Sequence, residues 1–70
     1  MQEITVKPVS ELSWTVELSG VQNPLVFMNG ALAEKAAKRL AKMLASAGRR
    51  TQISIYLRDG SLGGRLVASP

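Results

Sequence analysis

The chain has 70 residues, with nine Lys or Arg against five Asp or Glu, a formal net charge of +4 and 46% hydrophobic residues. This length suits one small domain, so residues 1–70 are predicted to fold as a single unit. The absence of Cys and His excludes disulfide bonds, the usual zinc sites and catalytic triads that use either residue. With no apolar run near the roughly 18 residues of a membrane span and no cationic targeting signal, a cytoplasmic protein without a membrane partner is expected.

Two strands are predicted in the first twenty residues. Ile4 and Val6 alternate with polar residues within residues 3–8, and Pro8 is expected to end this strand because it has no backbone N–H donor. Residues 12–19 give the clearest strand pattern of the chain, with polar residues between Leu12, Trp14, Val16 and Leu18.

A short apolar segment and a helix follow. The run 25–28 is interpreted as a third strand, with a plug beneath the helix as the alternative. Residues 30–47 are rich in good helix formers, Asn29 is a suitable N-cap and Gly48 a suitable stop, so this segment is predicted to be helical. The residues expected on its core-facing stripe are Ala33, Ala36, Ala37, Leu40, Leu44 and Ala47.

The C-terminal third predicts a hairpin. Apolar and polar residues alternate over residues 52–58, and Asp59-Gly60 is interpreted as a tight turn rather than as a catalytic carboxylate. Residues 62–68 return as a fifth strand, in which Gly63 and Gly64 indicate a bulge or fraying. Four large residues are interpreted as core rather than as a ligand site: Trp14, Phe27, Met28 and Met43.

Together these elements predict an α+β fold, in the order strand, strand, strand, helix, strand, strand. The helix is expected to pack on one face of a small, mainly antiparallel sheet. The opposite face is expected to be polar and to remain in water, which disfavours a large apolar dimer interface there. Its predicted residues are Thr5, Lys7, Ser13, Thr15, Glu17, Gln52, Ser54, Tyr56 and Arg58.

Several short motifs resemble a known family. They are Pro8, Trp14-Thr-Val16, Phe27-Met-Asn29 before a helix with Ala33, Ala36, Ala37 and Ala41, Ile53-Ser-Ile55, and Arg58-Asp59-Gly60-Ser-Leu62. In this order, from about Ile4 to Leu62, the chain resembles the small bacterial domains of unknown function numbered 2188. Members often carry His where this chain has Tyr56, and Gly where it has Ser13. The resemblance implies a bacterial domain with a sheet and one helix, and it implies no activity, cofactor or catalytic residue.

Positive charge is concentrated in one segment. Six of the nine cations are Lys35, Lys38, Arg39, Lys42, Arg49 and Arg50. With Glu34 as the only acid, residues 34–50 carry a net charge of +5, and the remainder carries −1. On a helical wheel the four helix cations occupy an arc of roughly 100° opposite the apolar stripe. This exposed ridge is interpreted either as a surface that follows a phosphate backbone or as an ordinary solvated face, in which Glu34 and Lys38 form an i,i+4 pair.

Tyr56 and Arg58 are a secondary candidate site. Both are expected on the open sheet face with Lys7 and Thr15, where Tyr56 can stack on a base and Arg58 can hold its phosphate. The alternative is a surface Tyr that supports its cross-strand neighbours. The presence of a single aromatic residue favours this alternative.

These features predict a non-enzymatic binding module for nucleic acid or another polyanion, without base specificity. The carboxylates are scattered, so no catalytic residue, cofactor or metal is expected. The alternative is a protein-interaction or homo-oligomeric assembly module, which uses an exposed sheet edge for a protein partner or a homodimer. The edges expected to be exposed are the first strand and the glycine-containing fifth.

Overall fold

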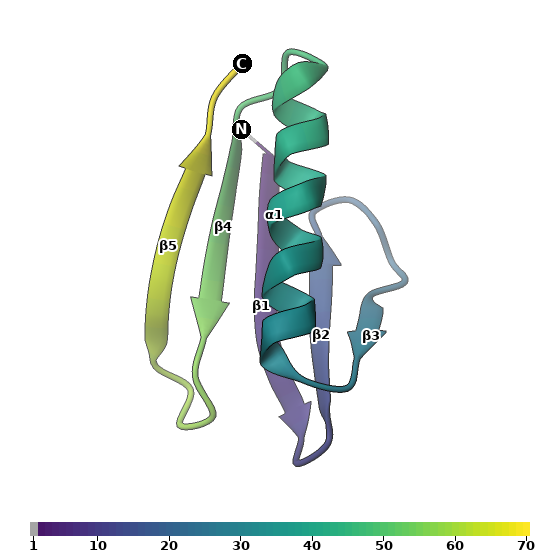
Figure 1. The fold of residues 1–70 in the computed structure, drawn as a ribbon, viewed down its shortest axis with the longest axis vertical. Coiled ribbons are helices and arrows are strands. Elements are labelled where there is room, and N and C mark those ends of the chain that lie inside the picture. The colour runs from purple at the N-terminus through teal and green to yellow at the C-terminus, as the bar shows by residue number, and fades with distance from the viewer. Residues whose placement is uncertain (1) are drawn as a thin grey trace.

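The computed structural model describes residues 2–70, in which five strands form one sheet and a single helix lies across one face of it (Figure 1). The strands are β1 (Gln2–Ser10), β2 (Ser13–Leu18), β3 (Leu25–Phe27), β4 (Thr51–Tyr56) and β5 (Leu62–Ala68), and the helix is α1 (Gly30–Ser46). The predicted α+β class and the predicted order of elements are confirmed.

The strand order in the sheet is β3-β2-β1-β4-β5. Neighbouring strands are antiparallel except for β1 and β4, which are parallel, with Ile4 beside Ile53 and Val6 beside Ile55. The chain therefore builds β2 and β3 on one side of β1, crosses over through α1, and returns on the other side as β4 and β5. The prediction that the first strand forms an exposed edge is wrong, because the crossover places β4 against it. The edges are β3 and β5.

Pro8 does not end the first strand, contrary to the prediction. β1 continues to Ser10, with an irregularity in its register against β2 between Pro8 and Ser10. Pairing with β4 runs only as far as Val6, so β1 has no neighbour on that side at Pro8. A proline is tolerated at an unpaired edge or a bulge because no ladder hydrogen bond is lost there.

The core lies between α1 and the three central strands. Its most buried residues are Ile4, Val6, Val16 and Ile53 from the sheet and Ala33, Ala37 and Ala41 from the helix. Alanine has a short side chain, so the helix backbone can lie close to the sheet. The helix spans 17 residues: the Asn29 side chain accepts a hydrogen bond from the Leu32 N–H at 2.8 Å, and Gly48 has a φ of 87°. Both predicted helix ends are thus close to the observed ones.

The buried face of α1 is rotated from the predicted stripe. The buried row is Ala33, Ala37, Ala41 and Ala45, while Ala47 is exposed as the C-cap residue. Each step of four residues turns about 40° around the helix axis, so this row winds towards the β5 side along the helix. The helical wheel assumes a core-facing stripe that runs parallel to the helix axis. The predicted stripe therefore left out Ala41 and Ala45.

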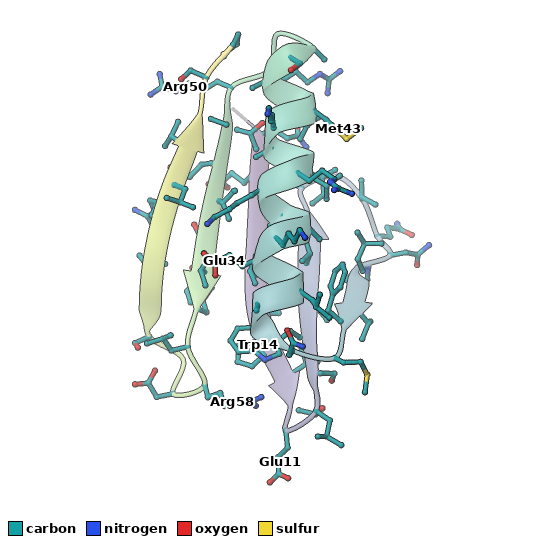
Figure 2. The ribbon with its side chains drawn as sticks, viewed as in Figure 1. Glu11, Trp14, Glu34, Met43, Arg50 and Arg58 are labelled. Carbon is teal, nitrogen blue, oxygen red and sulfur yellow. The ribbon has the colours of Figure 1, made fainter. Side chains whose placement is uncertain are left out.

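Two of the four predicted core residues are on the surface. Trp14 and Phe27 pack against the core, but Met28 and Met43 are exposed. Met28 lies between the end of β3 and the helix cap, and Met43 projects from α1 on the side where β3 lies (Figure 2). β3 has only three residues and is too short to cover that flank.

The turn between β4 and β5 and the register of these two strands confirm the predicted hairpin and its bulge. Gly60 has a φ of 88°, which suits glycine, and the register between β4 and β5 shifts so that Gly63 falls between paired residues.

Across residues 2–70, no helix is both long and apolar enough to cross a membrane.

Candidate functional site

All six cations of the candidate site are exposed. Lys35, Lys38, Arg39 and Lys42 lie on α1, whereas Arg49 and Arg50 lie in the link between α1 and β4. Because α1 covers the middle of the sheet, its cations span the outward helix face from one flank to the other. Lys35 and Arg39 border a groove beside β3, and Lys38 and Lys42 border a groove beside β5.

The link that carries the arginine pair is held by its backbone. The Arg50 carbonyl accepts a hydrogen bond from the Gln2 N–H at 2.9 Å, and the Arg49 carbonyl accepts one from the Thr51 hydroxyl at 3.1 Å. These bonds leave both guanidinium groups free. In Figure 2 Arg50 lies at the end of the molecule where α1 finishes.

One of the six cations has an acidic partner. The Lys38 Nζ lies 3.1 Å from the Glu34 Oε1, as the i,i+4 spacing predicted. Both side chains are about half exposed, so this pair adds little to stability. The other five cations form no ion pair with any residue in the range 2–70.

The open sheet face is polar, as predicted, but carries charges of both signs. The register aligns Thr5 with Glu17 and Ser54, and Lys7 with Thr15. The Lys7 Nζ lies 3.4 Å from the Glu17 Oε1, so this cation is partly neutralised. A continuous positive surface is therefore absent from the face opposite α1 in the described chain.

Arg58 has a role within the fold that the sequence analysis missed. Its Nη1 donates to the Ser10 carbonyl at 2.7 Å and its Nη2 donates to the Glu11 carbonyl at 3.0 Å. Its Cζ lies 5.6 Å from the centre of the Trp14 ring, within cation–π range. Figure 2 shows Arg58, Trp14 and Glu11 at the same end of the molecule. No local pattern reveals these bonds, because they join residues 47 and 48 positions apart.

Tyr56 and Arg58 nevertheless border the same shallow hollow of about 420 Å³, together with Lys7. The guanidinium of Arg58 is already used by two carbonyls and an indole ring. Its role as a phosphate ligand beside Tyr56 stays a prediction.

Asp59 is part of the turn. Its Oδ1 accepts hydrogen bonds from the Ser61 hydroxyl at 2.6 Å and from the Ser61 N–H at 2.9 Å. The side-chain bond, followed by the backbone bond, lowers the pKa of Asp59 because both favour the ionised carboxylate. Within the described residues, no group of three or more Asp and Glu side chains is placed to hold a metal ion.

Comparison with protein-family models, with curated proteins and with solved structures found no match for this chain. The resemblance to the domains of unknown function 2188 therefore stays a prediction.

Proposed function

We propose that this chain is a non-enzymatic binding module that holds a nucleic acid or another polyanion on the outward face of α1, without base specificity. The observation that carries the proposal is the set of five exposed cations that have no ion pair among the described residues: Lys35, Arg39, Lys42, Arg49 and Arg50. Phosphate groups that meet such side chains release condensed counterions, which favours binding at low salt.

The test is a titration of duplex DNA over a range of salt concentrations. If each of the five cations meets a phosphate, the logarithm of the binding constant falls with the logarithm of salt at a slope of about −4.5. A chain that binds no DNA at low salt contradicts the proposal.

A charge-matched pair of variants locates the surface. The double variant Lys42→Glu and Arg49→Glu is expected to weaken DNA binding at least tenfold and to flatten the salt slope by about 2. The control, Lys7→Glu with Arg65→Glu, makes the same change in net charge on the opposite sheet face, where the register places both residues. Equal losses from the two variants would mean that net charge, rather than this surface, governs binding.

A second candidate function is assembly through β5. This edge strand has seven residues, and Leu62, Leu66 and Val67 are exposed on it. Long apolar edges promote pairing with another strand because their backbone groups are unpaired. Sedimentation at high salt tests this candidate. The candidate is supported if the chain forms a dimer, if Val67→Lys dissociates that dimer, and if Val26→Lys on the β3 edge leaves it intact. A monomer at every concentration rejects it.

Membership of the domains of unknown function 2188, a bacterial origin and a cytoplasmic location are retained as predictions. They rest on the sequence patterns alone.

A further inference from the structure

One flank of α1 is apolar and uncovered. A groove of about 350 Å³ lies there, lined by Leu25 of β3 and by Leu32, Ala36, Leu40 and Met43 of α1. Leu25 is 49% exposed, Leu32 48% and Met43 62%. Three large apolar side chains thus share one concave surface, which is a feature of interaction sites rather than of scattered surface residues.

The apolar residues of this flank repeat with the period of a helix. Leu32, Ala36, Leu40 and Met43 follow the spacing i, i+4, i+8 and i+11. The first three each come one position before a buried alanine, Ala33, Ala37 or Ala41. The second stripe therefore lies beside the core stripe and faces past the edge of the sheet. Such a stripe fits the apolar face of an incoming helix, which contacts it at i, i+3, i+4 and i+7.

Charge decides which kind of helix fits. Lys35 and Arg39 stand on the same groove wall, both are exposed, and neither has an ion pair within residues 2–70. The groove lining contains no acid. Glu34, the only acid of α1, projects towards β4, on the other flank, and binds Lys38 there (Figure 2).

A second copy of the chain does not suit this groove. In a twofold dimer the same surface of both copies is buried, so Lys35 and Arg39 of both copies would share one interface whose lining contains no acid, and like charges within an interface are costly. The partner must therefore be apolar on one face and negatively charged beside it.

We propose that the groove between β3 and α1 is the docking site for an acidic amphipathic helix of a partner protein. The apolar face of that helix lies on Leu32 and Met43, and its Glu or Asp side chains meet Lys35 and Arg39. This proposal goes beyond polyanion binding, because it depends on apolar contacts that a phosphate backbone cannot make.

The first experiment is a methyl NMR titration of the whole chain, labelled with ¹³C at its methionine methyl groups. The probe is a synthetic 18-residue helical peptide with Leu along one face and Glu beside it. The Met43 signal is expected to shift saturably, while the signal of Met28, which is exposed outside the groove, stays in place. The same peptide with Lys in place of Glu is expected to leave Met43 unchanged.

A matched pair of variants then separates this site from polyanion binding. Leu32→Ser with Met43→Ser removes apolar contacts and keeps the charge, so it is expected to weaken binding of the labelled peptide at least tenfold in fluorescence anisotropy and to leave DNA binding unchanged. The control is Leu12→Ser with Met28→Ser, two residues that are each 72% exposed outside the groove. Its peptide affinity is expected to stay within twofold.

Three results would overturn the proposal. The acidic peptide fails to shift Met43 at millimolar concentration, or the Leu32→Ser and Met43→Ser variant binds it as tightly as the native chain. In the third, vesicles of phosphatidylglycerol and phosphatidylcholine shift Met43 and the peptide does not, which would assign the groove to a lipid surface. Loss of DNA binding alone would leave the docking site standing, because only peptide binding depends on the apolar side chains of Leu32 and Met43.

Discussion

At the scale of single residues, Arg58 links two turns that are far apart in the sequence: its own turn, between β4 and β5, and the turn between β1 and β2. Lysine keeps the charge but cannot donate to both the Ser10 and Glu11 carbonyls from one planar group. We expect Arg58→Lys to lower the free energy of unfolding by about 1–2 kcal/mol, measured by urea denaturation. Arg65→Lys on β5 is the control and is expected to change it by less than about 0.5 kcal/mol. Equal effects would show that the two hydrogen bonds contribute nothing specific.

Gly30 is also required by a single contact. A Cβ at this position would lie 3.0 Å from two atoms of the Trp14 ring. Gly30→Val is therefore expected to destabilise the fold by about 2–3 kcal/mol, because the larger side chain displaces the indole from beside Arg58. Ala31→Val, one residue further along α1 and exposed, is expected to cost about 0.5–1 kcal/mol through helix propensity alone. Thermal unfolding and Trp fluorescence measure both; an unshifted Trp emission in the Gly30 variant would contradict the contact.

Asp59 gives the fold a dependence on acid. The Ser61 hydroxyl and N–H lower its pKa in the folded state, so the folded chain binds a proton less readily than the unfolded chain. The resulting stability is fully present above the unfolded pKa of about 3.9 and is lost as the pH falls through the folded value. Asp59→Asn keeps an acceptor for the turn but does not titrate. Between pH 6 and pH 2.5 the native chain should lose more unfolding free energy than this variant, and parallel pH profiles would reject the assignment.

At the scale of elements, the alanine row of α1 sets the distance between helix and sheet. Ala37 is fully buried, so Ala37→Leu is expected to push α1 away from the sheet and to lower the free energy of unfolding by about 2–3 kcal/mol. Ala31→Leu places the same side chain at an exposed helix position and is expected to change it by less than about 0.5 kcal/mol. Urea denaturation compares the two. A similar small effect at both sites would mean that the interface has room.

The strands and helix were largely predictable because their signals are local. The alternation around Ile4 and Ile53, the Asn29 cap and the Gly60 turn each depend on residues a few positions apart. The rotation of the buried helix face was not predictable from the wheel, because it depends on how α1 crosses the twisted sheet. For the same reason the six cations could be identified, but the distribution of the four helix cations between two grooves could not.

At the scale of the whole molecule, β1 is the strand on which the sheet is built. It pairs with β2 on one side and β4 on the other, whereas β3 and β5 each have one neighbour. Amides of β1 and β4 are therefore expected to exchange most slowly with deuterium, and those of β3 and β5 most rapidly, in ¹⁵N NMR spectra of the dilute chain. Protection in β5 equal to that in β1 would contradict this order, and protection that rises with concentration would indicate strand pairing between copies.

By itself the sequence determined which segments form strands and helix, where α1 begins and ends, and that the positive charge gathers between residues 35 and 50. It did so because periodicity, caps and turns are properties of neighbouring residues. Only the tertiary structure decided that β1 lies at the centre, that Arg58 closes one end of the sheet, and that a short β3 leaves the flank at Leu32 and Met43 open. These depend on pairings such as Glu3 with Gln52, which are 49 positions apart, and no local pattern records which distant strands meet.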